Sequence, residues 1–398
     1  MGDNSKKPGI RFKGFTDDWE QRKLGEIITE YKETVDSECT LPILTSSKTE
    51  GVILQEEHFG RKQQHDITGY NILPRNYCTY RNRSDGVDFT FNINKCCDKG
   101  IISKFYPVFS GKNSDVFFLS LVLNNSDEVV REIAYTCTGT GQKVLSFLDL
   151  QKMKVRVPSY DEQKEIAAYF ENLDHLITLH QRKYDKLVMS KKSMFEKMFP
   201  KNGQTKPEIR FSGFTDDWEQ RKLGKVAESY SGGTPSVGNK SYYDGSIPFI
   251  RSAEINSEST ELFLTEKGLS NSSARMVSKG DILYALYGAT SGEVGRSRIN
   301  GAINQAILTI LPHDGYDAEF LMQWLRKSKQ SIIDVYLQGG QGNLSAAIVK
   351  ALEVDFPSLA EQRQIGTYFQ SLDHLITLHQ RKVFSRLFLN KSTIFREN

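Results

Sequence analysis

The pattern of apolar and polar residues predicts two long amphipathic helices. From residue 159 to 199, apolar side chains recur at spacings of three and four residues or their multiples, and no Gly or Pro interrupts them before Pro200. A helix of this length would be about 60 Å long, so we expect it to pack on a similar helix. A second stripe of the same kind lies in residues 357–398. The residues expected at the seam are Ile166, Phe170, Leu173, Ile177, Leu187, Ile365, Phe369, Leu372, Ile376 and Val383.

The two helical segments are copies of one another. Residues 158–183 return as residues 357–382, which is 199 positions later, and the last eleven residues, LDHLITLHQRK, are identical. We call these segments the helical repeats. A second pair, which we call the leading repeats, has the same offset: residues 11–26 (RFKGFTDDWEQRKLGE) and 210–225 (RFSGFTDDWEQRKLGK). The sequences between them are unlike, so the chain reads as one scaffold that carries two different recognition surfaces.

Both helical repeats begin with a residue pattern that is typical of a helix N-terminus. Ser159 and Glu162, and likewise Ser358 and Glu361, form the capping-box pattern, in which the serine caps an amide and the glutamate is expected to reach back to the cap. The two helices are expected to form an intramolecular antiparallel coiled coil that acts as a spacer. A helix in an ordinary bundle is the alternative.

The regions before the helices predict mixed α/β domains, with many short β-rich segments and one clear helix at 318–337. The expected fold class is therefore α+β, with two mixed α/β recognition domains separated by the two helices and related by an internal pseudo-two-fold duplication. The predicted boundaries are 1–157 for the first domain, 158–200 for its helix, 201–209 for a linker, 210–356 for the second domain and 357–398 for the second helix.

Composition adds little to this picture. Of the 398 residues, 38% are hydrophobic and 25% are charged, as in ordinary folded proteins, and the net charge of +3 permits a nucleic-acid partner without implying one. The five cysteines show no CxxC pair or disulfide pattern, and no apolar run has the length of a signal core or membrane span. We therefore expect a cytoplasmic protein.

Catalytic signatures are missing from the sequence. It contains no phosphate-binding loop, nucleophile elbow or HExxH motif. The Asn/Asp-Pro-Pro-aromatic motif, with which methyltransferases hold the amine of a target base, is also missing. The recurring Asp17-Asp18 and Asp216-Asp217 pairs could hold Mg²⁺ in a nuclease, but such pairs more often cap the next segment. Four histidines lie on the helices, but a spacing of five residues does not place two on one face. We therefore predict no catalytic residue and no metal site.

The recognition domains instead offer polar donors and aromatic rings beside Gly-rich loops. Arginine and lysine suit guanine edges and phosphates, and glycine allows backbone to approach a sugar-phosphate chain closely. For any single residue, solvated surface charge is the alternative. The candidate DNA-binding residues are Ser46, Lys48, Arg61, Tyr80, Arg81, Arg83, Lys104, Thr234, Tyr243, Arg251, Tyr287, Arg296 and Arg298.

The whole chain resembles the specificity (S) subunit of type I restriction-modification enzymes. The resemblance rests on the IRFxGFTDDWEQRKLG segments at 10–25 and 209–224, the PSxxEQxxI helix starts at 158 and 357, and the LDHLITLHQRK cores. SGGTPS, YYDGSIPFIR and VSKGDILYALYGATSGEVG in the second domain add to it, while the first domain matches more thinly.

This resemblance implies a non-catalytic subunit that recognises double-stranded DNA. Each domain would read one half of a bipartite target, the helices would set the spacer, and methyltransferase subunits, expected to number two, would dock on the frame. Motor-nuclease subunits would join through the complex, and S-adenosylmethionine, ATP and Mg²⁺ are expected on these partners, with no cofactor in this chain. A protein adaptor built on the coiled coil, and a duplicated nuclease or methyltransferase, are the rival classes.

Overall fold

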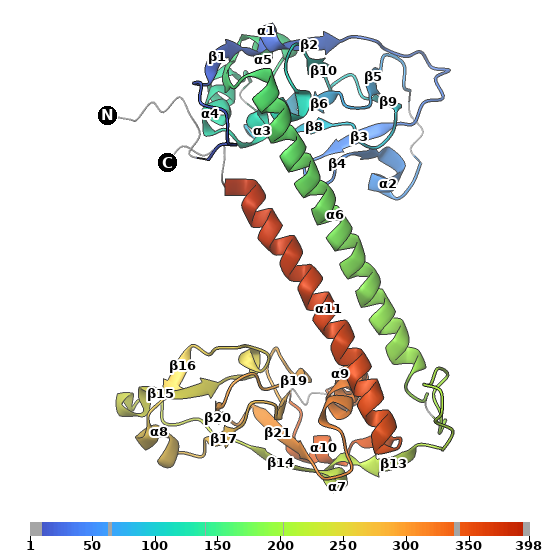
Figure 1. Cartoon of the computed structure of the whole chain (residues 1–398), viewed down its shortest axis with the longest axis vertical. Helices are drawn as coiled ribbons and strands as arrows, with labels where there is room; N and C mark the ends of the chain where they lie inside the picture. The colour runs from blue at the N-terminus through green and yellow to red at the C-terminus, as the bar shows by residue number, and fades with distance from the viewer. Residues whose placement is uncertain (1–9, 63–65, 140, 202, 338–342, 393–398) are drawn as a thin grey trace. The chain divides into compact units, whose positions relative to one another are not determined.

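The computed structural model describes residues 10–62, 66–139, 141–201, 203–337 and 343–392. The chain divides into two compact units, of which unit 1 comprises residues 1–181 and 381–398 and unit 2 comprises residues 182–380. Both predicted long helices are confirmed as α6 (Tyr160–Lys197) and α11 (Leu359–Ser392), and each contributes residues to both units (Figure 1). The outermost residues of the predicted domains, 1–9 and 393–398, lie outside the described ranges.

Unit 1 is built around a four-stranded antiparallel sheet in the order β2 (Ile28–Tyr31), β10 (Val108–Gly111), β6 (Cys78–Tyr80) and β8 (Phe91–Ile93). The two-stranded pairs are β1 (Glu20–Lys23) with β12 (Lys154–Val157), β3 (Leu44–Ser47) with β4 (Gly51–Leu54), β5 (Asn71–Pro74) with β9 (Lys99–Ile102), and β7 (Arg83–Ser84) with β11 (Lys143–Val144). Its shorter helices are α1 (Leu24–Ile27), α2 (Gln55–Phe59), α3 (Val116–Asn125), α4 (Asp127–Thr136) and α5 (Phe147–Lys152).

Unit 2 contains a similar antiparallel sheet, in the order β14 (Ala227–Ser231), β21 (Ile307–Pro312), β18 (Ile282–Ala285) and β19 (Val294–Arg296). A second sheet runs β16 (Leu262–Leu264), β15 (Tyr243–Ile250), β20 (Gly301–Ile303) and β17 (Arg275–Val277), with β15 and β20 parallel. The remaining elements are the pair β13 (Glu219–Lys222) and β22 (Glu353–Phe356), the helices α7 (Leu223–Val226), α8 (Glu266–Ser270), α9 (Ala318–Tyr336) and α10 (Ala346–Ala351), and the 3₁₀ turns η1 (Lys240–Tyr242) and η2 (Ser252–Glu254). The mixed α/β prediction is confirmed for both units.

The repeated segments form the same frame inside each unit. The leading repeat supplies one strand of a short pair, and the strand before the long helix supplies the other. In unit 1, Glu20 lies opposite Val157, and in unit 2, Glu219 lies opposite Phe356, so the two registers agree at the 199-residue offset. The offset seen in the sequence is therefore also an offset of backbone pairing.

A buried ion pair ties each leading repeat to the start of its long helix. Glu162, whose side chain is fully buried, accepts hydrogen bonds from Nε and Nη2 of Arg11 at 2.6 Å, and Glu361 accepts the same pair from Arg210 at 2.7 Å. The serine half of the predicted capping box is present, since Ser159 Oγ accepts from the Glu162 amide at 3.4 Å. The expectation that the glutamate reaches back to the cap was wrong, because a buried carboxylate is stabilised far better by a bidentate guanidinium.

The glutamine that follows each of these glutamates makes a second connection. The Gln163 side chain accepts from the Asp115 amide at 3.0 Å and donates to the Pro158 carbonyl at 3.0 Å, while Gln362 accepts from the Asp317 amide at 2.9 Å. Asp115 and Asp317 are the N-caps of α3 and α9. The Glu-Gln dipeptide of each helical repeat therefore joins three segments: the leading repeat, the long helix, and helix α3 in unit 1 or α9 in unit 2.

The apolar residues assigned to a helix–helix seam lie mainly in the cores of the two units. Residues 166, 170 and 173 are buried in the core of unit 1, with Ile177 at its edge, and residues 365, 369 and 372 are buried in the core of unit 2. Ile166, Phe170, Leu173, Ile365, Phe369 and Leu372 therefore serve as domain-core residues, which the seam prediction did not foresee, and among them Phe369 also contacts Phe195 of α6. A domain core of strands and helices offers these side chains more apolar surface than one facing helix does. Leu187 and Ile376 are half-buried, and Val383 is buried.

The end of α6 is nevertheless held against the start of α11 within unit 2. The Phe195 ring stacks on Phe369 with a centroid distance of 4.3 Å and an interplanar angle of 16°. Lys191 forms an ion pair with Asp373, which also accepts from Arg326 Nη1 of α9 at 2.9 Å. Burial lowers the pKa of Lys191, and the Asp373 carboxylate opposes that effect. Both long helices are thus anchored in unit 2.

Candidate nucleic-acid interface

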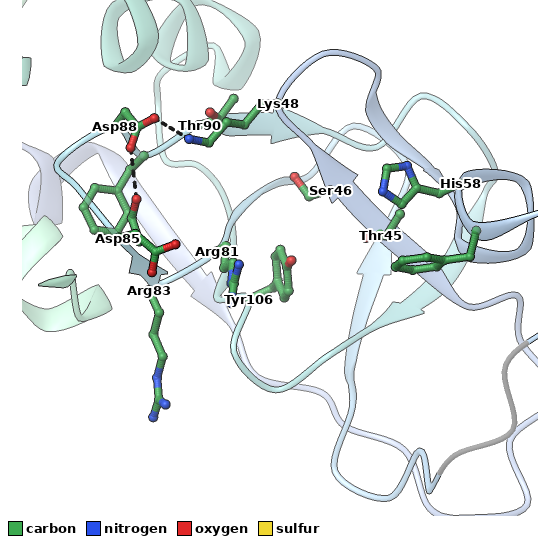
Figure 2. Close-up of a pocket in the computed structure, with 13 residues that line it drawn as sticks. Thr45, Ser46, Lys48, His58, Arg81, Arg83, Asp85, Asp88, Thr90 and Tyr106 are labelled. Atoms are coloured by element: carbon green, nitrogen blue, oxygen red, sulfur yellow. Dashed lines mark hydrogen bonds and ion pairs between the residues drawn. The ribbon is translucent and has the colours of Figure 1, made fainter. Parts of the chain in front are cut away.

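Four of the candidate DNA-binding residues of unit 1 line one cavity. This cavity has a volume of about 510 Å³ and lies between the β3–β4 hairpin and the chain that follows β6 (Figure 2). The candidates in its wall are Ser46, Lys48, Arg81 and Arg83. They come from two segments more than thirty positions apart, so only the fold brings them together.

One wall of the cavity is fixed by hydrogen bonds. The Asn92 side chain donates to Ser46 Oγ at 2.9 Å, which sets the position of that hydroxyl. Lys48 pairs with Asp88, and Ser84 Oγ donates to the same carboxylate at 3.0 Å. The hydrogen bond from Lys48 first, and that from Ser84 second, lower the pKa of Asp88. The ammonium group of Lys48 is therefore partly neutralised where it stands.

Arg81 is differently placed. Its guanidinium lies beside the Tyr106 ring (Figure 2), and no hydrogen bond or ion pair joins it to any residue in the described part of the chain. Burial raises the pKa of Tyr106, while the Arg81 charge and a hydrogen bond with Thr45 oppose the rise. The cavity thus presents an exposed, unpaired set of N–H donors next to a half-buried aromatic ring, which suits an anionic or acceptor-rich ligand such as a base edge or phosphate.

The other candidates of unit 1 have separate environments. Tyr80 was a wrong choice, because its side chain is fully buried and its hydroxyl donates to the Leu145 carbonyl at 3.1 Å, so it belongs to the core. Arg61 is exposed and lies outside the cavity. Lys104 also lies outside the cavity, with its ammonium 5.9 Å from the centre of the Phe105 ring.

In unit 2, two candidates form hydrogen bonds with one glutamine, and a third bonds to the segment beside it. Thr234 Oγ1 donates to Gln305 Oε1 at 2.6 Å, and the Tyr243 hydroxyl donates to the carbonyl of Pro235, the residue after Thr234, at 2.7 Å. Burial raises the pKa of Tyr287, and a hydrogen bond with Gln305 acts in the opposite direction. Gln305 thus links the Gly-rich 231–235 segment to the loop after β18. The choice of candidate residues missed Gln305.

The three candidate arginines of unit 2 already have protein acceptors. Arg251 pairs with Glu254 at 3.0 Å and with Glu261 at 2.6 Å. Arg298 pairs with Glu258 at 2.8 Å. Arg296 Nε donates to the Gly280 carbonyl, and its Nη1 lies 3.7 Å from a carboxylate oxygen of Glu319. Their N–H edges face carboxylates or a carbonyl, so each would have to exchange these partners to contact DNA.

Sequence reasoning also overlooked Arg275 of β17. Its guanidinium carbon lies 4.0 Å from the centre of the Tyr230 ring in β14. These residues are far apart in sequence and belong to different sheets, so no local pattern could have paired them.

The structure also bears on the aspartate pairs that the sequence analysis weighed as a metal site. Among the described residues, no group of three or more His, Cys, Asp or Glu side chains could hold a metal ion. Of the recurring aspartates, Asp217 pairs with Lys206 at 2.9 Å and accepts a hydrogen bond from Thr205 at 3.0 Å, so it holds the linker in place.

Of the helices in the described ranges, none has the length and apolar character to cross a membrane.

Comparison with known proteins gives one consistent family. The family described as the type I restriction modification DNA specificity domain matches residues 16–189 and again residues 215–383. The chain is 30% identical over 168 residues to the type I restriction enzyme MjaIX specificity subunit of Methanocaldococcus jannaschii, a match that covers 40% of this chain and 39% of the relative. It is 22% identical over 310 residues to the MjaVIII specificity subunit of the same organism, covering 71% and 70%.

A solved structure shares the fold over almost the whole chain. The crystal structure of the type I restriction-modification system S subunit from M. genitalium matches with a TM-score of 0.60 and 13% identity, covering 96% of each chain. The match to the MjaIX subunit spans well under two thirds of that relative's length.

Proposed function

Because the chain belongs to the type I restriction modification DNA specificity domain family, we propose that it is the subunit that gives such a system its DNA sequence specificity. In this proposal each of its two recognition domains binds one half of a bipartite, double-stranded DNA target. The protein would confer the same specificity on methylation and on restriction.

The observation that carries the proposal is one frame that holds two unlike domains. Three features recur at the 199-residue offset: the buried Arg–Glu ion pair, the register of the short strand pair, and the start of the long helix. The surfaces attached to this frame differ, since unit 1 has the open cavity around Arg81 and unit 2 has the Gln305 cluster. Two copies of one scaffold with different binding surfaces are what recognition of two different half-sites requires.

The long helices would act as the spacer between the half-sites. We propose that α6 and α11 form an antiparallel pair that sets the separation of the recognition domains and carries two methyltransferase subunits, with motor-nuclease subunits joining the complex. The identical LDHLITLHQRK segments support this view, because two copies of one surface suit two copies of one partner.

The proposal includes no chemical step on this chain. S-adenosylmethionine, ATP and Mg²⁺ would be bound by the partner subunits, since the sequence carries none of the motifs for methyl transfer or nucleotide hydrolysis. An adaptor that joins proteins through its helices would not need two unlike binding surfaces on one frame.

The test is to produce the chain with its methyltransferase subunits in cells and to map the methylated sites. A defined bipartite sequence is expected. Exchange of residues 219–356 for the equivalent domain of a related chain should change one half-site and leave the other intact. The control is the same exchange for residues 27–152, which should change only the other half-site. Methylation without a bipartite sequence, or a change in both half-sites after one exchange, would refute the proposal.

A further inference from the structure

Each recognition domain holds an exposed arginine that lies over an aromatic ring and forms no ion pair. In unit 1, the guanidinium carbon of Arg83 is 4.5 Å from the centre of the Phe105 ring. In unit 2, that of Arg275 is 4.0 Å from the centre of the Tyr230 ring. Within the described ranges, neither guanidinium has a hydrogen bond or an ion pair, and both arginines are exposed.

This environment differs from that of three other arginines at the surface. Arg251 and Arg298 in unit 2, and Arg75 in unit 1, turn their N–H edges to carboxylates. A guanidinium that lies over a ring uses its flat face for the contact and leaves its edge free. Arg83 and Arg275 therefore keep the donors that a bidentate contact needs, and stacking restricts the orientations those donors can take.

Each ring residue is hydrogen-bonded to an immediate sequence neighbour of its arginine. The Tyr230 hydroxyl donates to the carbonyl of Met276, the residue after Arg275, at 2.9 Å, so the ring and the arginine are tied through one strand. In unit 1, the Phe105 carbonyl accepts from the amide of Asn82, the residue before Arg83, at 2.9 Å. In each case a hydrogen bond joins the ring residue to an immediate neighbour of the arginine. The two domains, although unlike in sequence, thus share the same arrangement of an arginine over an aromatic ring.

The surroundings of Arg83 also favour a nucleic-acid ligand. It belongs to the wall of the 510 Å³ cavity that contains Arg81 and Ser46, and its side chain points away from the Lys48–Asp88 pair (Figure 2). Lys104 lies over the same Phe105 ring. This cluster places the oriented N–H donors of the Arg83 guanidinium near two further positive charges, Arg81 and Lys104. Those charges suit contacts with the phosphates of the DNA backbone.

We propose that Arg83 and Arg275 are specificity-determining residues, each of which donates two hydrogen bonds to a guanine edge, one in each half of the target. The inference rests on the proposed function and adds to it the residues and the base that they recognise. The fork of the guanidinium matches the O6 and N7 acceptors of guanine in the major groove.

The experiment maps methylated sites for the chain with its partner subunits, comparing the parent with Arg83→Ala and Arg275→Ala. Arg83→Ala should relax the preference for one G·C pair in the first half-site by about ten- to a hundredfold, and Arg275→Ala should do the same in the second half-site only. Phe105→Leu and Tyr230→Leu, which remove the stacking platform, should relax the same base pairs to a smaller extent. Arg75→Ala and Arg221→Ala, which remove exposed arginines paired with carboxylates, are the matched controls and should leave both half-sites unchanged.

The unaffected half-site reports in every variant that the chain is folded and assembled. If an alanine variant fails to assemble, Arg83→Gln and Arg275→Gln take its place and should show the same single-position loss. Unchanged half-sites in the arginine variants would overturn the inference and leave the proposed function standing, as would an equal weakening at all sequences, which is the behaviour of a phosphate contact. A parent that methylates no defined sequence would overturn both.

Discussion

The buried Arg11–Glu162 pair permits a quantitative test of how the frame is held together. Glu162→Ala would remove a carboxylate whose side chain is completely buried and leave Arg11, whose side chain is 13% exposed, without its partner. The equivalent change in unit 2 is Glu361→Ala, because Arg210 has the same exposure there. Each variant should weaken its own unit and leave the other unit unchanged.

The magnitude follows from the geometry. Removal of one partner from a buried ion pair costs about 3–5 kcal/mol, because the remaining charge is left unpaired in a poorly solvated site. Since Arg11 retains some contact with water, we expect the lower end, about 3 kcal/mol, or about a hundredfold rise in the local opening equilibrium. The double variant Arg11→Met/Glu162→Leu should recover most of this loss, because no unpaired charge remains.

Native-state hydrogen exchange read by mass spectrometry is the suitable assay, because peptides from the two units are resolved separately. Peptides that cover β1, β12 and α3 should exchange faster in Glu162→Ala, and those that cover β13, β22 and α9 should do so in Glu361→Ala. Lys164→Ala is the control, since it removes an exposed pair with Asp161 at 2.8 Å and should leave the exchange of these peptides close to that of the parent.

Two results would refute this reasoning. One is a Glu162→Ala variant whose exchange matches that of Lys164→Ala, which would mean that the buried pair contributes no more than a surface pair. The other is a double variant that is destabilised by the sum of the two single changes, which would mean that the residues act independently.

Three further predictions concern the helices and the second domain. Phe195→Ala should destabilise unit 2 by about 2–3 kcal/mol in urea unfolding, because it removes the ring stacked on Phe369, whereas Val335→Ala, at a 66% exposed site, should have little effect. Burial alone would raise the pKa of Glu254, but hydrogen bonds from Arg251 and from backbone amides lower it from 4.5 to about 2. The stabilisation from this carboxylate is therefore present above pH 4.5 and lost as the pH falls towards 2, and Glu254→Gln should flatten that dependence by about 1–3 kcal/mol in unfolding measured across this range. Insertion of two helical turns, seven residues, between Leu173 and Leu187 and at the matching place in α11 lengthens each helix by about 10 Å. Mapping of methylated sites should then show a longer spacer between unchanged half-sites. An unchanged spacer would refute the proposal that the helices set the separation of the half-sites.

Much of the architecture could be predicted because it depends on short-range patterns. The period of the apolar residues and the serine caps predicted where α6 and α11 start to within two residues, since the predicted segments begin at 158 and 357 and the helices at Tyr160 and Leu359. Comparison of the chain with itself revealed the frame, since Arg11 and Arg210 recur at the same offset as Glu162 and Glu361. The partner of each glutamate could not be found in this way, because capping by a near neighbour and pairing with a residue 151 positions away fit the same sequence.

By itself, the sequence determined the two long helices, the twofold repeat and the family, because each is written in residue types at fixed spacings. Only the tertiary structure decided what the individual side chains do. It placed Tyr80 in the core and paired Arg251 and Arg298 with carboxylates, while Arg81, Arg83 and Arg275 have no acceptor among the residues that the structure describes. The reason is physical: burial and pairing of a charge depend on which distant segments meet around it, and a one-dimensional pattern does not contain that information.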